Sequence, residues 1–116
     1  MAMTAMMTSA QASVSMATMM TEAQFQQKVT DLCDWLGLKW HHETDSRKSK
    51  KGFPDLVIAG PGGVLFAELK SQKGRVSAAQ RGWLSTLGDA GANCYLWRPS
   101  DWPDVEARLR QLAGRF

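Results

Sequence analysis

The sequence predicts an α/β fold in which a mixed four-stranded sheet is flanked by helices. Two observations support this prediction. Apolar residues recur at helical spacing within 21–37, 77–91 and 100–116, and short apolar runs typical of strands lie between these segments. The resulting order is α-β-β-β-α-β-α, in which a helical crossover makes the fourth strand parallel to the third. The length of 116 residues suits one small domain, and the sequence shows no repeats.

The segment 1–20 precedes the predicted single domain, 21–116. It contains all seven methionines and no charged residue. It lacks both the basic region and the continuous apolar stretch of a signal peptide. We therefore expect a disordered, methionine-rich tail, or sequence upstream of the true start.

The first helix is predicted within 21–37. Thr21 and Gln24 form a capping-box pattern at its start, and Gly37 ends it. Between these signals, apolar residues follow helical spacing: Phe25, Val29, Leu32 and Leu36. The sequence LKWHH then predicts a short strand, and the polar, basic sequence ETDSRKSKKG predicts a loop.

The next two strands are predicted over 55–59 and 64–70, as a hairpin around Pro61 and Gly62. Proline followed by glycine favours a type II turn, and this register places Asp55 opposite Glu68. A type II turn is not the favoured connection of a tight hairpin, so a longer loop is the alternative. That loop would place Asp55 opposite Lys70, on the same face of the sheet.

The remaining elements are a helix, a strand and a last helix. Ser77 and Gln80 form a second capping box, and the following helix is expected to carry Trp83, Leu84 and Leu87 inward until it ends at Gly91. NCYLW predicts a buried strand. The last helix is expected to be capped by Asp101, with one apolar stripe of Val105, Leu109, Leu112 and Phe116, and with Trp102 as the most exposed tryptophan.

Three charged side chains interrupt the apolar hairpin: Asp55, Glu68 and Lys70. Alternate side chains of a strand share a face, so either hairpin register brings all three together. Two carboxylates at cross-strand distance repel each other unless a cation lies between them. Mg²⁺ suits this arrangement, because it binds through one or two carboxylates and completes its coordination with water and phosphate oxygens. Mn²⁺ is expected to substitute for it.

A metal ion at this position would polarise a phosphodiester and supply hydroxide, while Lys70 would orient the attacking water or neutralise developing charge. The alternative is a surface hairpin end at which Lys70 forms an ion pair with Glu68 or Asp55. Both faces of the strands are otherwise apolar, and basic sequences flank the hairpin. These two features favour the metal site.

Positive charge is concentrated in the middle of the chain. The segment from Lys39 to Arg81 contains nine Lys and Arg against four Asp and Glu, whereas the rest of the chain has five against seven. This pattern predicts a polyanionic partner. Solvated loops are the alternative for the basic side chains beside the hairpin, which are the predicted phosphate contacts: Arg47, Lys48, Lys50, Lys51, Lys73 and Arg75.

These motifs resemble the virus-type replication-repair nuclease (VRR-NUC) branch of the PD-(D/E)XK nuclease superfamily. The resemblance covers about 22–102 and is most specific in Gly52-Phe53-Pro54-Asp55, Glu68-Leu69-Lys70 and the segment 77–80. It implies a restriction-endonuclease-like core followed by an additional C-terminal helix.

The resemblance also implies roles for individual residues. Asp55 and Glu68 would be metal ligands, the backbone carbonyl of Leu69 a third ligand, and Lys70 the catalytic lysine. Gln80 matches a glutamine that borders the family's site, although its place in a capping box also explains it. Glu22 matches an acid on the first helix and would support the metal, although the helix dipole alone favours an acid there.

Small single-domain members of this family are similar to Holliday-junction resolvases. The resemblance therefore implies a homodimeric endonuclease that cuts branched DNA. Cleavage of flaps or plain duplex by the same site is the enzymatic alternative, and a DNA-binding module without catalysis is the alternative from another class.

Two further observations concern location. The cysteines Cys33 and Cys94 lack metal-ligand spacing, and no apolar run approaches membrane-spanning length. We therefore expect reduced, buried thiols, no membrane partner, and a place in the cytoplasm of a bacterial or phage-infected cell.

Overall fold

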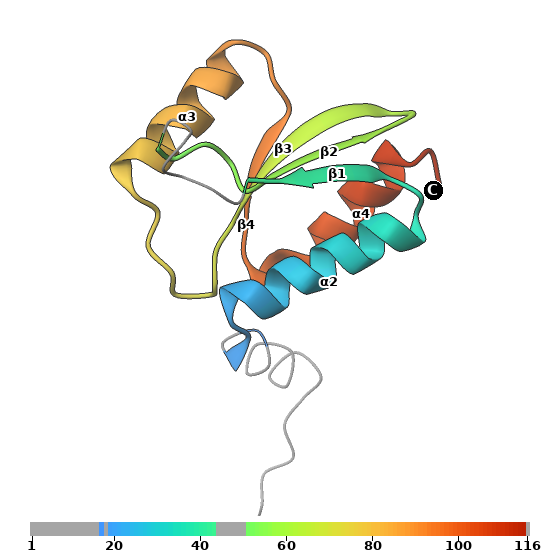
Figure 1. Cartoon of the computed structure of the whole chain (residues 1–116), viewed down its shortest axis with the longest axis horizontal. Helices are drawn as coiled ribbons and strands as arrows, with labels where there is room; N and C mark the ends of the chain where they lie inside the picture. The colour runs from blue at the N-terminus through green and yellow to red at the C-terminus, as the bar shows by residue number, and fades with distance from the viewer. Residues whose placement is uncertain (1–16, 18, 44–50, 116) are drawn as a thin grey trace, which may run out of the picture.

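The computed structural model describes residues 17, 19–43 and 51–115. It confirms the predicted element order and adds a short 3-10 turn before the last helix (Figure 1). The elements are α2 (Glu22–Trp35), β1 (Lys39–His42), β2 (Leu56–Gly60), β3 (Gly63–Leu69), α3 (Ala78–Asp89), β4 (Cys94–Trp97), the 3-10 turn (Pro99–Asp101) and α4 (Trp102–Leu112).

The sheet is mixed, as predicted, with strand order β1-β2-β3-β4. The pairs β1–β2 and β2–β3 are antiparallel, and β3–β4 is parallel because α3 crosses over between them. Gly60 pairs with Gly63, which makes Pro61 and Gly62 the central residues of the hairpin turn. Of the two predicted registers, the one that places Asp55 opposite Glu68 is therefore correct.

The predicted type II turn is wrong, because that turn requires a positive φ at Gly62. The positive φ, 124°, lies at Gly63 instead. Packing against the end of α4 accounts for the difference. The N–H of Gly62 donates to the carbonyl of Leu112 at 2.8 Å, and a Cβ on Gly62 would lie 2.7 Å from the carbonyl oxygen of Gln111.

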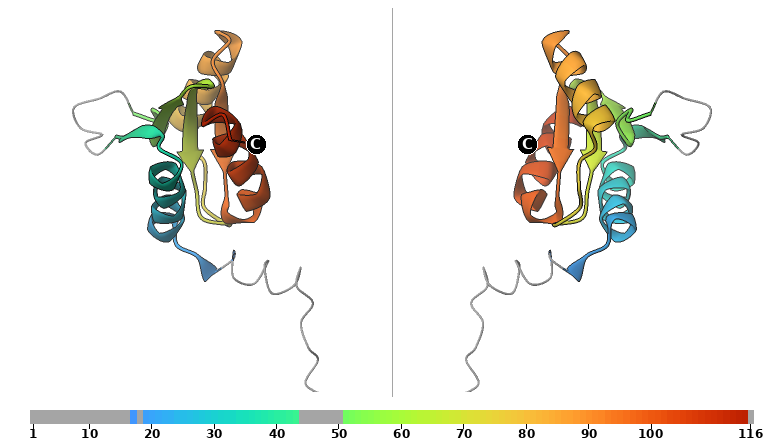
Figure 2. Two further views of the ribbon diagram at one scale, coloured as in Figure 1. Left: turned by 90° about the vertical axis from the view of Figure 1, so that its right-hand side faces the viewer. Right: turned by 90° about the vertical axis from the view of Figure 1, so that its left-hand side faces the viewer.

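The hydrophobic core lies on one face of the sheet, where α2 and α4 cover it (Figures 1 and 2). Helical spacing brings Phe25, Val29 and Cys33 of α2 to this face. Alternate residues of the strands also face the core, and so does the predicted apolar stripe of α4. The buried residues of the strands are Leu56, Ile58, Leu65, Ala67, Leu69 and Trp97, and those of α4 are Val105, Leu109 and Leu112.

The opposite face of the sheet is covered only in part by α3, which stands apart from α2 and α4 in both views of Figure 2. No residue of α3 is fully buried, and the side chains expected to point inward are half-buried: Trp83, Leu84 and Leu87. The expectation that the fourth strand is buried is wrong. As an edge strand it buries only Trp97, and Leu96 is 38% exposed.

Both predicted capping boxes are present. The side chains of Thr21 and Ser77 accept the N–H of Gln24 and Gln80, each at 3.1 Å. Asp101 occupies the predicted N-cap position of α4, but its side chain does not cap that helix. Its Oδ2 accepts the N–H of Arg98 at 2.8 Å and so closes the 3-10 turn instead. Phe116 lies outside the described residues.

Most of the expected N-terminal tail also lies outside the described residues. Of that segment, Ala17 is buried and Met20 packs against the core. Cys33 is buried and Cys94 is half-buried, and both thiols are free. Within the described parts of the chain, no helix combines the length and apolar character needed to cross a membrane.

Candidate functional site

The hairpin brings Asp55 and Glu68 together at its open end, which lies opposite the turn. Leu56 pairs with Ala67, so the next residues outward, Asp55 and Glu68, face each other across the strands. The N–H of Leu69 donates to Asp55 Oδ2 at 2.8 Å, which fixes the direction of that carboxylate. The predicted convergence of these side chains is present in the structure.

Glu68 is the unusual member of the pair, because only 1% of its surface is exposed. Its Oε1 accepts a hydrogen bond from Gln80 Nε2 at 2.8 Å. Its Oε2 is buried and has no hydrogen-bond partner among the residues that the structure describes. Such an atom is costly unless a cation or proton satisfies it, because a buried polar group loses its hydration.

The electrostatic environment of Glu68 is consistent with this cost. Burial and the neighbouring carboxylate of Asp55 raise the pKa of Glu68 to about 8, although the ammonium of Lys70 acts in the opposite direction. At neutral pH without a metal, the pair therefore holds a proton. A divalent cation would replace that proton and relieve the repulsion between the two carboxylates.

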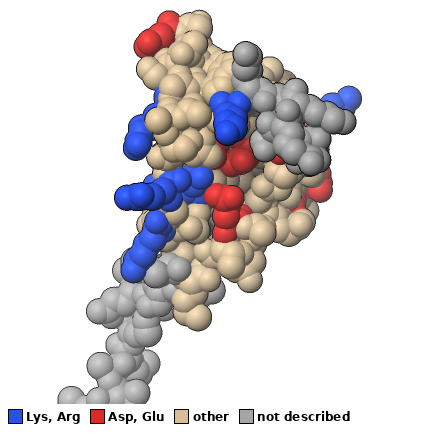
Figure 3. Space-filling model, turned by 60° about the vertical axis from the view of Figure 1, so that its left-hand side comes forward, with Lys and Arg blue, Asp and Glu red and all other residues tan. Residues whose placement is uncertain are grey.

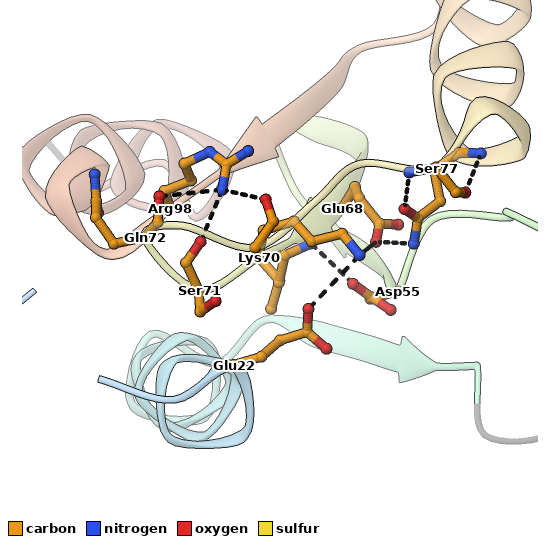
Figure 4. A network of polar contacts seen from close by, with 11 residues as sticks. Glu22, Asp55, Glu68, Lys70, Ser71, Gln72, Ser77 and Arg98 are labelled. Carbon is orange, nitrogen blue, oxygen red and sulfur yellow. Dashed lines mark hydrogen bonds and ion pairs between the residues drawn. The ribbon is translucent and has the colours of Figure 1, made fainter. Parts of the chain in front are cut away.

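Lys70 lies between carboxylates from two different elements (Figure 4). Its Nζ is 4.0 Å from Glu68 Oε1 and 3.9 Å from Glu22 Oε1, at the first turn of α2. The side chain of Lys70 is only 14% exposed. The ammonium is thus held beside the carboxylate pair, where it could contact a water or an anion bound at the same place.

Gln80 links the site to the start of α3. Its Oε1 accepts the N–H of Ser77 at 2.8 Å, and its Nε2 donates to Glu68. The same side chain therefore caps the helix and holds the buried carboxylate. The predicted border position of Gln80 agrees with this contact.

Sequence reasoning missed the part played by Gly52 and Phe53, which position α3. Gly52 has a φ of 88°, and a Cβ there would lie 2.4 Å from the carbonyl carbon of Ala79, so only glycine allows this close approach. The ring of Phe53 contacts those of Phe66 and Trp83, with centroid distances of 6.1 and 5.1 Å. The GFPD sequence is the signal that could identify them, and the resemblance assigns a role only to its Asp55.

Arg98 is a second structural residue that sequence reasoning missed. Its Nη1 contacts the carbonyl oxygens of Ser71, Gln72 and Gly74 at 2.8, 3.3 and 2.8 Å (Figure 4). It thereby holds the connection that follows Lys70. A single arginine directly after a strand carries no sequence signal for such a role.

The predicted phosphate contacts are only partly described. Lys51, Lys73 and Arg75 are exposed. Figure 3 shows acidic side chains in the middle of one face, with Lys and Arg side chains above and to the left of them. The other predicted contacts lie outside the described residues: Arg47, Lys48 and Lys50.

The donor set fits a magnesium ion better than an all-protein cage. No group of three or more His, Cys, Asp and Glu side chains is arranged to hold a metal within the described parts of the chain. Two carboxylates and an unpartnered buried oxygen suit Mg²⁺, which keeps several water and phosphate ligands. The predicted ligand roles all stay predictions, as does the catalytic role of Lys70; the predicted ligands are Asp55, Glu68, Glu22 and the Leu69 carbonyl.

The fold and the grouped acids and lysine define a nuclease-type domain with a restriction-endonuclease-like fold. The family model described as "VRR-NUC domain" matches residues 6–100, and this chain belongs to the VRR-NUC family within the PD-(D/E)XK superfamily. The match begins inside the methionine-rich segment.

One solved structure, described as a VRR_NUC domain protein, is similar in fold. It superposes with a TM-score of 0.59 at 23% identity, over 84% of this chain and 93% of that chain. No curated protein matches the sequence.

Proposed function

We propose that this protein is a Mg²⁺-dependent endonuclease that hydrolyses phosphodiester bonds in DNA, with branched DNA as its substrate. The observation that carries the proposal is the buried, unpartnered Oε2 of Glu68, which lies beside Asp55 and Lys70. A salt bridge on the surface would not require such a costly arrangement. A metal site that is completed by a bound phosphate would.

Asp55 and Glu68 would hold the ion, with Glu22 and the Leu69 carbonyl as further candidates. Once bound, Mg²⁺ or Mn²⁺ would supply Lewis-acid polarisation of the phosphoryl group and a water of lowered pKa. The side chains of the protein would position the reacting groups. Gln80 fixes the orientation of the Glu68 carboxylate, and Lys70 is placed to orient the attacking water or to neutralise charge on the phosphate.

DNA as the substrate is supported by the VRR-NUC family and by the excess of positive charge between Lys39 and Arg81. The described part of the chain contains one such site, so paired cuts in a four-way junction would require two chains. A C2 homodimer is therefore part of the proposal. We place its action in the cytoplasm of a bacterial or phage-infected cell.

Cleavage of flaps or duplex by the same site is the second candidate, because nothing in the hairpin specifies the shape of the DNA. A DNA-binding module without catalysis is disfavoured by Asp55 and Glu68. A binder would hold phosphate better without two acids beside its basic side chains.

The test is cleavage of matched, end-labelled DNAs: a four-way junction, a 5′ flap, a 3′ flap and a linear duplex. Each is incubated with Mg²⁺, Mn²⁺, Ca²⁺ or EDTA. The proposal predicts paired symmetric cuts in the junction with Mg²⁺ or Mn²⁺ and none with EDTA. Preferential cutting of flaps or duplex would replace the substrate assignment, and tight binding without cleavage of any DNA would favour the binding module.

A further inference from the structure

A basic pocket of about 770 Å³ lies next to the carboxylate site, between the segment 74–77, the first turn of α3 and the end of β4. Three arginines line it, Arg75, Arg81 and Arg98, and none of the described residues that line it is Asp or Glu. Three guanidinium groups around one concavity produce a strong positive potential there.

The described residues provide no ion-pair partner for these arginines. None of the three forms an ion pair with any residue in the part of the chain that the structure describes. Arg98 is the fixed member of the group, because its Nη1 contacts three backbone carbonyls and holds the connection at 71–74. Arg75 and Arg81 are exposed, so their charged ends are free to meet a ligand.

The backbone adds to this potential. Ser77 and Ala78 line the pocket at the start of α3, a helix of 12 residues. The N–H of Ala78 donates no hydrogen bond to a described residue, and the helix dipole places partial positive charge at this end. The pocket therefore combines guanidinium groups with a backbone donor, which together suit a phosphate group.

The pocket is linked to the proposed catalytic side chains through residues that line it. Ser77 lines it and bonds to Gln80, which in turn bonds to Glu68, with both hydrogen bonds at 2.8 Å. On the other side, Gly74 lines it, and a Cβ on Gly74 would lie 3.5 Å from Lys70 Cδ. A DNA strand whose scissile phosphate lies at Lys70 would thus pass a neighbouring phosphate into the pocket.

We propose that this pocket binds a backbone phosphate of the DNA strand that is cut, next to the scissile bond, and so fixes the strand in the site. The inference rests on the proposed nuclease function. It assigns DNA-binding roles to Arg81 and Arg98, in addition to Arg75. The planar fork of arginine matches phosphate oxygens in a bidentate manner, which distinguishes this pocket from a diffuse lysine-rich surface.

The test is DNA binding measured by fluorescence anisotropy in EDTA, so that it does not depend on cleavage. The variants are Arg75→Ala, Arg81→Ala and the double variant. Arg98 is left intact because its loss would release the 71–74 connection. Arg115→Ala is the matched control, because this exposed arginine lies beyond the end of α4 and forms no ion pair with a described residue.

Each pocket variant is expected to bind DNA about tenfold more weakly. The slope of log affinity against log salt should fall by about 0.7 to 0.9 per arginine. The control should retain the wild-type slope to within about 0.3, and circular dichroism should show native folding of every variant. Wild-type slopes in the pocket variants, or an equal loss of DNA affinity in the control, would contradict the proposed role of the pocket.

Inorganic phosphate provides the second arm of the experiment. At constant ionic strength, millimolar phosphate should compete only weakly with DNA. If phosphate shifts the melting temperature of the wild type but not of the double variant, while DNA binding is unchanged in that variant, the pocket is a free-phosphate site and the proposal fails. Failure of the nuclease function would appear separately, as a wild type that cuts no DNA.

Discussion

The buried carboxylate of Glu68 makes the metal-free protein less stable as the pH rises. The pKa of this group is raised from the ordinary 4.5 to about 8, so between these values the folded chain binds its proton more tightly than the unfolded chain does. The resulting stabilisation is complete below about pH 4.5 and is lost as the pH rises through about 8. Glu68→Gln keeps the shape but cannot ionise, so this pH dependence should disappear.

The magnitude follows from the size of the shift. One pKa unit is worth about 1.4 kcal/mol, which gives an upper limit of about 5 kcal/mol for the full displacement. Water penetration and relaxation of the site reduce this value, and we expect about 2 kcal/mol. For a domain of this size, that change corresponds to about 10 °C in melting temperature.

The assay is thermal unfolding followed by circular dichroism in EDTA, from pH 5 to pH 9, for the wild type and Glu68→Gln. The two proteins differ at no other residue, so the contributions of all other groups cancel in the difference. The melting temperature of the variant should rise relative to the wild type by about 10 °C across this range. Added Mg²⁺ should recover the wild type at pH 8 to 9 and leave the variant unchanged. Parallel curves for the two proteins would refute the argument that Glu68 is desolvated beside a second carboxylate.

Three further predictions concern α3 and assembly. Gln80→Ala should lower the apparent affinity for Mg²⁺ in cleavage assays at least tenfold, because Glu68 loses its orientation. The matched capping-box variant Gln24→Ala should lose only about 1 kcal/mol of stability and keep the wild-type dependence on Mg²⁺. If both variants depend on Mg²⁺ in the same way, Gln80 serves only to cap α3. Gly52→Ala should destabilise the fold by about 2 kcal/mol in urea unfolding, because the added Cβ meets the backbone of Ala79 at a positive φ; unchanged stability would show that the close approach is not required. Light scattering over a concentration series should give the mass of a dimer, and a monomer that still makes paired cuts would contradict the proposed assembly.

The hairpin shows how far the sequence predicts the site. Strand alternation and a Pro-Gly turn are local signals, so they were sufficient to place Asp55 opposite Glu68 and Lys70 nearby. The turn type was wrong because packing of Gly62 against the end of α4 decides it, and that contact joins residues about fifty positions apart. Local patterns do not contain such information.

The burial of Glu68 could not be predicted either. Its seclusion depends on Gln80 and on the position of α3, and that position depends on Gly52 and the ring of Phe53. These residues belong to no periodic pattern. The predicted inward face of α3 is correct, because Trp83, Leu84 and Leu87 are its least exposed apolar side chains, but they are only half-buried. Apolar spacing predicts which face of a helix turns inward but not how closely that face packs.

The tryptophans illustrate the same limit. Trp102 was expected to be the most exposed, yet it packs against the core with the ammonium of Lys28 4.1 Å from its ring centre. Trp35 is 69% exposed instead. The location of Trp102 next to a proline at the start of a helix does not predict which other helix packs against its ring.

The most direct test of the central claim is to separate cleavage from binding in three variants: Asp55→Asn, Glu68→Gln and Lys70→Ala. Cleavage of a four-way junction is followed in Mg²⁺, and binding of the same DNA is followed in EDTA. Cleavage should fall by several orders of magnitude in all three variants, because the metal or the positioned ammonium is lost. Binding by the two acid variants should be unchanged or tighter, since each loses a negative charge that faces phosphate. If both acid variants cut the junction at the wild-type rate, the three side chains form only a salt bridge and the account of this site is wrong.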